Sequence, residues 1–155
     1  MNPNQVARLF SSNNVTKVLT IESSGIALAY AAAVSLGVPM VFAKKHKSSN
    51  LAGNILTSKV FSYTHQQTYD IMVSGDYIRK DDVILIVDDF LAMGNALNGL
   101  IDITNQAGAK LAGCAIAIEK GFQGGGDALR AKGIRVESLA IIDKMTDDSL
   151  EFRPQ

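Results

Sequence analysis

The sequence has little cysteine and no excess of charge of either sign, and both absences exclude classes of protein. Cys114 is the only cysteine, so no intramolecular disulfide can form, which is typical of a reducing compartment such as the cytoplasm. Its apolar neighbours, Leu111–Ile118, favour a buried thiol over a reactive one. Fifteen basic and 15 acidic residues give a formal net charge of zero. The charge therefore gives no reason to expect a nucleic-acid or acidic-membrane partner.

The sequence also lacks a signal peptide and an unbroken hydrophobic span. The stretch from Gly25 to Ala43 carries no charge, but Gly37 and Pro39 interrupt it. These residues favour a helix, a turn and a buried strand over a membrane-spanning helix. We therefore expect no association with a membrane.

What is present is a globular composition, with 155 residues, 47% hydrophobic and 19% charged. This length suits one domain over residues 1–155, and we find no internal repeat. The predicted strands are Val15–Ile21, Val38–Ala43, Val83–Val87, Leu111–Ile118 and Ile134–Ile142, and the predicted helices are 4–12, Ile26–Leu36, Ala96–Gln106 and Asp127–Lys132. Because apolar strands alternate with helices, we predict an α/β fold with a mostly parallel central sheet and helices on both faces.

Four segments lie outside this alternation. Val60–Tyr63 and Tyr69–Val73 are predicted to pair as antiparallel strands, and Ser149–Phe152 as an edge strand. The polar, partly basic segment 44–57 is interpreted as a mobile lid or loop. Residues 119–126 are interpreted as a flexible loop because they end in three glycines, followed by Asp127 as the N-cap of a helix.

The most informative stretch is Val83–Leu97, where a buried strand runs into two acids, a small-residue loop and a helix. Ligands bind at the carboxyl ends of such strands in open α/β sheets. The backbone N–H groups of Ala92–Ala96 suit a phosphate, and Asp88 and Asp89 suit sugar hydroxyls or a cation bound to a sugar phosphate. A plain strand-to-helix connection, with acids that complement the helix dipole, explains the same residues equally well.

Residues 83–96, VILIVDDFLAMGNA, resemble the motif with which type I phosphoribosyltransferases bind phosphoribosyl pyrophosphate (PRPP). That motif has four apolar residues, two acids, two apolar residues and a small-residue phosphate loop. Met93 and Asn95 stand where Thr and Gly are usual, as in the variant of bacterial xanthine phosphoribosyltransferases. Segments 20–27, 37–47, 118–123 and 135–140 resemble further parts of that family, in the same order and spacing.

The resemblance implies roles for individual residues. The PRPP 5-phosphate would be bound by Ala92, Met93, Gly94, Asn95 and Ala96, and the ribose hydroxyls by the catalytic acids Asp88 and Asp89. The pyrophosphate would be bound by Ser23, Ser24, Gly25, Lys44 and Lys45. For the two lysines, a solvated loop is an equally good interpretation.

The resemblance places the purine at Lys120 and Phe122. A lysine offers donors and no acceptor, so it suits the keto oxygen of a 6-oxopurine better than the amino group of adenine. Phe122 would stack on the base or pack under its loop. From the residues alone, an exposed lysine at the end of a strand is the favoured interpretation of Lys120.

The implied reaction is displacement of pyrophosphate from PRPP by xanthine, which gives xanthosine 5′-monophosphate. The family also implies Mg²⁺ carried by the PRPP with no direct protein ligand, and a homodimer. Related enzymes carry a third acid in the phosphate loop, where this sequence has Ala92. No general base is therefore identified.

Xanthine enzymes of this family carry an N-terminal segment that forms a hood over the purine, and we expect that hood to be absent here. Two alternatives to xanthine salvage stay open. One is a PRPP-binding regulatory or non-catalytic domain, although the sequence shows no helix-turn-helix segment. The other is an enzyme that prefers hypoxanthine or guanine.

Overall fold

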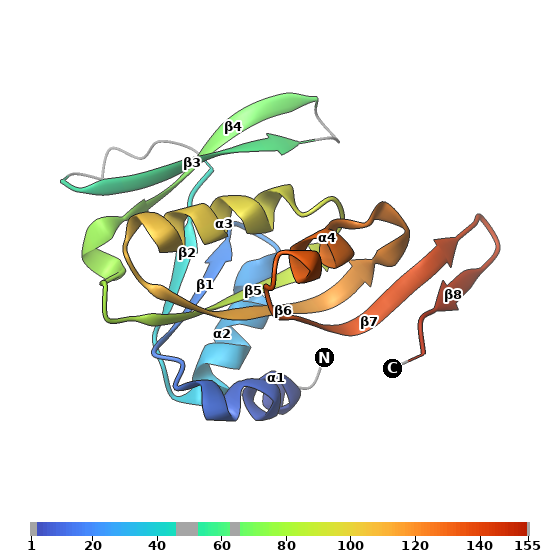
Figure 1. The fold of residues 1–155 in the computed structure, drawn as a ribbon, viewed down its shortest axis with the longest axis horizontal. Coiled ribbons are helices and arrows are strands. Elements are labelled where there is room, and N and C mark those ends of the chain that lie inside the picture. The colour runs from blue at the N-terminus through green and yellow to red at the C-terminus, as the bar shows by residue number, and fades with distance from the viewer. Residues whose placement is uncertain (1–2, 46–52, 63–65, 155) are drawn as a thin grey trace.

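The computed structural model describes residues 3–45, 53–62 and 66–154, and its centre is a six-stranded sheet (Figure 1). In spatial order its strands are β2 (Met40–Ala43), β1 (Lys17–Ile21), β5 (Val83–Leu91), β6 (Lys110–Lys120), β7 (Val136–Met145) and β8 (Leu150–Phe152). All neighbouring pairs are parallel except β7 and β8. The predicted mostly parallel sheet is confirmed, and the edge strand predicted over Ser149–Phe152 forms β8 from Leu150.

Helices cover both faces of this sheet, as predicted. The helices α1 (Pro3–Phe10) and α2 (Gly25–Leu36) pack on one face, and α3 (Asn95–Gln106) and α4 (Gly125–Ala131) lie on the other. Side chains alternate along β5, so that Leu85 and Val87 meet the first pair while Ile84 and Ile86 face the second. Burial on both faces explains why this strand is apolar throughout.

The uncharged stretch from residue 25 to 43 folds as a helix, a turn and a strand, which confirms the prediction. Helix α2 ends at Gly37, whose φ of 69° is left-handed and whose N–H caps the carbonyls of Ala33 and Val34. The chain then enters β2. Among the helices of the described residues, none is long and apolar enough to cross a membrane.

A separate antiparallel hairpin, β3 (Ile55–Ser62) and β4 (Gln67–Ser74), lies over α3 (Figure 1). It confirms the predicted pairing, with both strands longer than expected. A Cβ on Gly99 of α3 would lie 2.7 Å from Val60, so this glycine allows the close approach of the hairpin. Because β3 begins at Ile55, the loop predicted over 44–57 is wrong for residues 55–57. Its central part, 46–52, lies outside the described residues.

The segment predicted as a flexible loop over 119–126 is ordered, which is a second correction. Strand β6 continues to Lys120, Gly121–Gln123 form a 3-10 turn, and Gly125 begins α4. Gly124, with φ of 77°, is the N-cap, so the N-cap predicted at Asp127 is wrong. Asp127 instead lies in the first turn, 3.3 Å from both Arg130 and Arg153.

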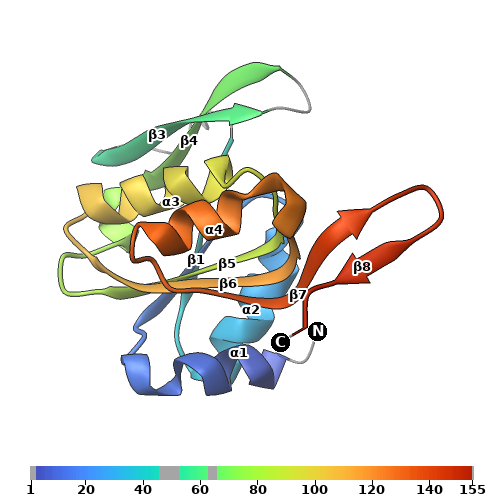
Figure 2. The same ribbon diagram turned by 45° about the vertical axis from the view of Figure 1, so that its right-hand side comes forward.

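The β7–β8 hairpin projects from the body of the molecule, as Figure 2 shows most clearly. Its end returns to the sheet, where the Arg153 N–H donates to the Ile141 carbonyl at 2.8 Å. The Arg153 guanidinium also contacts Asp143 at 2.8 Å. The chain's last described residues therefore lie beside the 3-10 turn after β6.

Candidate active site

The two acids of the motif lie in the last part of β5 and have different environments. Asp88 is 5% exposed, whereas Asp89 is half-buried. The Asp89 N–H donates to Asp88 Oδ1 at 3.0 Å, and the Phe90 N–H donates to Asp89 Oδ1 at 2.9 Å. Since neighbouring side chains of a strand alternate, the two carboxylates leave opposite faces of β5. They are a buried acid and a more accessible one.

Between β5 and α3, residues 92–94 form a tight turn. Gly94 has φ of 87° and is the N-cap of α3, a conformation that favours glycine. Its carbonyl accepts from the backbone and the side-chain amide of Asn98, each at 2.9 Å. The first N–H groups of a helix have no carbonyl partner within it, so they are suited to bind an anion.

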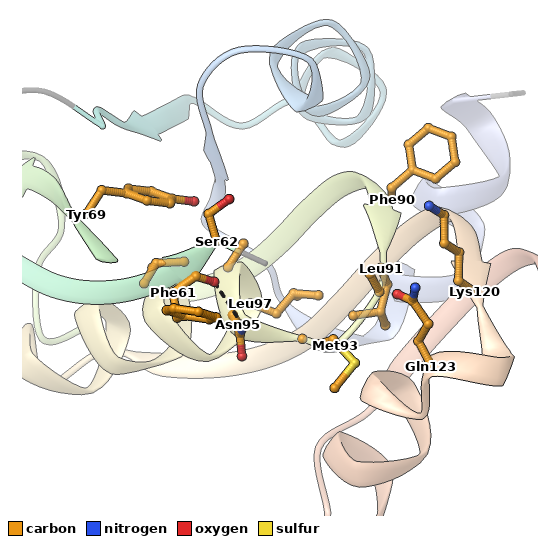
Figure 3. Close-up of a pocket in the computed structure, with 14 residues that line it drawn as sticks. Phe61, Ser62, Tyr69, Phe90, Leu91, Met93, Asn95, Leu97, Lys120 and Gln123 are labelled. Carbon is orange, nitrogen blue, oxygen red and sulfur yellow. Dashed lines mark hydrogen bonds between the residues drawn. The ribbon is translucent and has the colours of Figure 1, made fainter. Parts of the chain in front are cut away.

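This turn forms one wall of a cavity of about 420 Å³ (Figure 3). The other walls come from the β3–β4 hairpin, the end of β5 and the end of β6. Asn95 Nδ2 donates to the Phe61 carbonyl at 3.0 Å, which ties the first turn of α3 to the hairpin. The lining residues are Val60, Phe61, Ser62, Tyr69, Phe90–Leu97, Lys120 and Gln123. The structure thus brings the predicted phosphate loop and Lys120 to the same cavity.

Phe90 lines this cavity, although the sequence analysis assigned it no role. Lys120 Nζ lies 5.7 Å from the centre of the Phe90 ring, and both side chains line the cavity (Figure 3). Phe90 is 50% exposed although it lies within the mostly buried strand β5. Phe122, the aromatic residue predicted at the base, is also exposed but is not among the lining residues. The available signal in the sequence was an aromatic residue directly after the two acids of the motif.

The predicted pyrophosphate loop adjoins the buried acid. Ser23 and Ser24 are exposed between β1 and α2, and Gly25 is buried behind them. A Cβ on Gly25 would lie 2.6 Å from Asp88 Oδ1 and 2.7 Å from Thr20 Oγ1. The Thr20 hydroxyl is buried and has no hydrogen-bond partner among the residues that the structure describes. Gly25 therefore packs closely against the side chains of Asp88 in β5 and Thr20 in β1.

Burial raises the pKa of Asp88 to about 7, and the neighbouring Asp89 charge adds to the rise while Lys45 opposes it. Burial and the Asp88 charge also raise the pKa of Tyr69. Lys45 Nζ lies 5.7 Å from the Tyr69 ring centre. Lys45 is thus close enough to act on the acid, whereas the Lys44 side chain lines a separate groove beside Tyr77.

Residues 5–146 match the model of the phosphoribosyl transferase domain, and this chain belongs to that family. More particularly, it is 48% identical to the xanthine phosphoribosyltransferase of Oceanobacillus iheyensis, over 97% of this chain and 78% of that protein. The xanthine phosphoribosyltransferase of Ruminiclostridium cellulolyticum is 53% identical, over 92% of this chain and 75% of that protein.

A solved structure shares the fold. The adenine phosphoribosyltransferase of Giardia lamblia, complexed with 9-deazaadenine, superimposes with a TM-score of 0.80 at 27% identity. The match covers 92% of this chain and 78% of that one. The fold inferred from the motif and its flanking segments is confirmed.

Proposed function

We propose that this chain catalyses transfer of the phosphoribosyl group of PRPP to xanthine, which releases pyrophosphate and forms xanthosine 5′-monophosphate. One observation carries the choice of base. The chain is 48% and 53% identical to two xanthine phosphoribosyltransferases over more than nine-tenths of its length, against 27% for the adenine enzyme of similar fold. Lys120 supports the same choice, because its donors suit a keto oxygen.

The proposed roles follow the resemblance, and of these residues Ala92–Ala96 and Lys120 line the cavity. Ala92–Ala96 bind the 5-phosphate, Asp88 and Asp89 the ribose hydroxyls, Ser23–Gly25 with Lys44 and Lys45 the pyrophosphate, and Lys120 with Phe122 the purine. The position of Phe90 beside Lys120 in the cavity supports adding Phe90 to the purine contacts. These assignments place the two substrates against each other at the ends of β5 and β6.

Catalysis in this arrangement depends on positioning and charge. The purine nitrogen must approach the ribose carbon in line with the departing pyrophosphate. Holding both substrates in this geometry lowers the activation free energy by several kcal/mol. Positive charge grows on the ribose as the bond to pyrophosphate breaks. The carboxylates of Asp88 and Asp89 would stabilise that charge where they hold the sugar.

The proposed cofactor is a Mg²⁺ that arrives with PRPP. Within residues 3–45, 53–62 and 66–154, no group of three His, Cys, Asp or Glu side chains converges to hold a metal ion. Mg²⁺ usually keeps several waters and is bound largely through substrate phosphates, so it would arrive with PRPP and need no direct protein ligand. The metal would neutralise the departing pyrophosphate.

The proposal also covers the domain organisation, the oligomeric state and the cellular compartment. Residues 1–155 would form one phosphoribosyltransferase domain, assembled as a homodimer in the cytoplasm. The lack of a second cysteine supports a reducing compartment. Cys114 itself is buried, and burial raises the pKa of its thiol to about 12, so it is an unreactive core residue. Light scattering coupled to gel filtration would give the mass of the assembly, and a monomer would contradict the dimer.

The direct test is pyrophosphate release by this chain with PRPP, Mg²⁺ and one base at a time, using xanthine, guanine, hypoxanthine and adenine. We expect the highest kcat/KM with xanthine. Preference for hypoxanthine or guanine would keep the enzyme and overturn the choice of base. PRPP binding by calorimetry without turnover of any base would overturn the catalytic proposal.

Replacing Lys120 with alanine is expected to raise the KM for xanthine about 10- to 100-fold, since the loss of a charged hydrogen bond is on the order of 1.5–3 kcal/mol. PRPP affinity should stay near normal, because the phosphate loop is built on other elements. Lys132→Ala, an exposed lysine at the end of α4, is the matched control. Equal loss of PRPP and xanthine affinity in Lys120→Ala would contradict the role of Lys120 in base binding.

A further inference from the structure

Glu119 is a buried acid that the proposed reaction does not use. It is fully buried at the end of β6, immediately before Lys120. Since successive side chains of a strand point to opposite faces, Glu119 points away from the cavity that Lys120 lines. A buried carboxylate is costly unless it is paired, so its partners indicate what it holds in place.

The partners of Glu119 come from two other elements. Arg130 of α4 donates to both carboxylate oxygens, from Nη1 at 2.9 Å and from Nη2 at 2.7 Å, and Ser138 of β7 donates to Oε2. Arg130 Nε also donates to the Val136 carbonyl at 3.2 Å. Burial alone would raise the pKa of Glu119, but the bonds from Arg130 and Ser138 outweigh it and lower that pKa. The acid is therefore held as a carboxylate that fixes α4 to β6 and β7.

Helix α4 in turn packs on the phosphate loop. The Gly125 N–H donates to the Ala92 carbonyl at 3.1 Å, and a Cβ on Gly125 would lie 2.5 Å from the Met93 carbonyl carbon. A Cβ on Gly126 would overlap the Glu119 carboxylate and lie 2.9 Å from Arg130 Nη1. The first turn of α4 thus fits between the phosphate loop and the Glu119–Arg130 pair, with no room for a side chain on either glycine.

We propose that the Glu119–Arg130 pair acts as a positioning device that fixes the phosphate loop relative to Lys120. Glu119 precedes Lys120 in the chain, and Arg130 holds the helix that supports Ala92. This inference rests on the proposed function, in which one group binds the 5-phosphate and the other binds the purine. Small errors in that spacing matter, since a misplacement of about 1 Å lowers rate by about 100-fold.

The test is Glu119→Gln, which keeps the shape and removes the charge. We expect kcat to fall by about 100-fold while the two KM values stay close to wild type, because each substrate still binds but the pair is misaligned. Glu137→Gln is the matched control, because it removes the half-exposed Arg135–Glu137 pair elsewhere on the same sheet. That control should keep wild-type kcat. Ser138→Ala, which retains the ion pair and removes one donor to Glu119, should give a smaller fall in kcat.

A wild-type kcat in Glu119→Gln, with only a lower Tm, would overturn the positioning role. A second readout separates this result from failure of the proposed function. Titration with ribose 5-phosphate, followed by amide ¹H–¹⁵N spectra, should shift Lys120 together with Gly94 in wild type and Gly94 alone in Glu119→Gln. Absence of turnover in wild type would overturn the proposed function. The spectra would still decide the role of Glu119, since equal responses of Lys120 in both proteins would contradict it.

Discussion

Replacing Gly125 with alanine is expected to lower kcat/KM by at least about 100-fold. The added carbon would push the phosphate loop away from α4, and a displacement of about 1 Å is enough to lower the rate by about 100-fold. Its Cβ would overlap the Ala92 carbonyl oxygen and lie 2.7 Å from the Gly94 nitrogen. Both are backbone atoms, so neither can rotate away as a flexible side chain would. PRPP affinity, measured by calorimetry, should fall with the activity.

The matched control for this variant is Gly133→Ala, just beyond the other end of α4. A Cβ there meets nothing within 4 Å, but φ is +80°, so alanine is strained by about 1–2 kcal/mol. Gly133→Ala should therefore lower Tm and leave kcat/KM unchanged. Activity of Gly125→Ala close to wild type would show that α4 does not fix the phosphate loop.

The sequence predicted the phosphate loop and the acids because all of them lie within one continuous segment, residues 83–97. A strand, two acids, a glycine turn and a helix are consecutive there, so local patterns define this part of the site. The apolar strands and the breakers at Gly37 and Pro39 predicted the sheet for the same reason. Such features need no knowledge of which segments meet in space.

The missed features depend on contacts between distant segments. Phe90 lies near Lys120 because β5 and β6 pair in parallel, with Phe90 opposite Ile118, and that register is set by the assembled sheet. The glycines at 125 and 126 were interpreted as flexibility, since glycine is permissive on its own. In the fold they are small because the phosphate loop and Glu119 leave no room for a side chain. Local sequence cannot distinguish these two reasons for glycine.

Asp88→Asn is expected to raise Tm at pH 8 and to lower turnover by about 10- to 100-fold, as loss of a charged hydrogen bond to the sugar would. The stability gain follows from burial. The folded state raises the pKa of Asp88 from an ordinary 3.8 to about 7, so the native protein binds this proton more tightly than the unfolded chain does. The free energy of unfolding contributed by Asp88 therefore falls as pH rises from about 4 to about 7 and is constant outside that window.

The measurement is the difference in Tm between Asp88→Asn and wild type from pH 4 to pH 8, which cancels groups that titrate in both proteins. A shift of about three pKa units corresponds to on the order of 4 kcal/mol, or roughly 10 °C for a chain of this size. The difference should be smallest near pH 4 and largest above pH 7. Asp89→Asn should also lower turnover, because its carboxylate is proposed to hold the ribose. A pH-independent difference for Asp88→Asn would show that ionising the buried acid does not destabilise the fold. Asp88 could then bind the ribose as a carboxylate without lowering the free energy of unfolding.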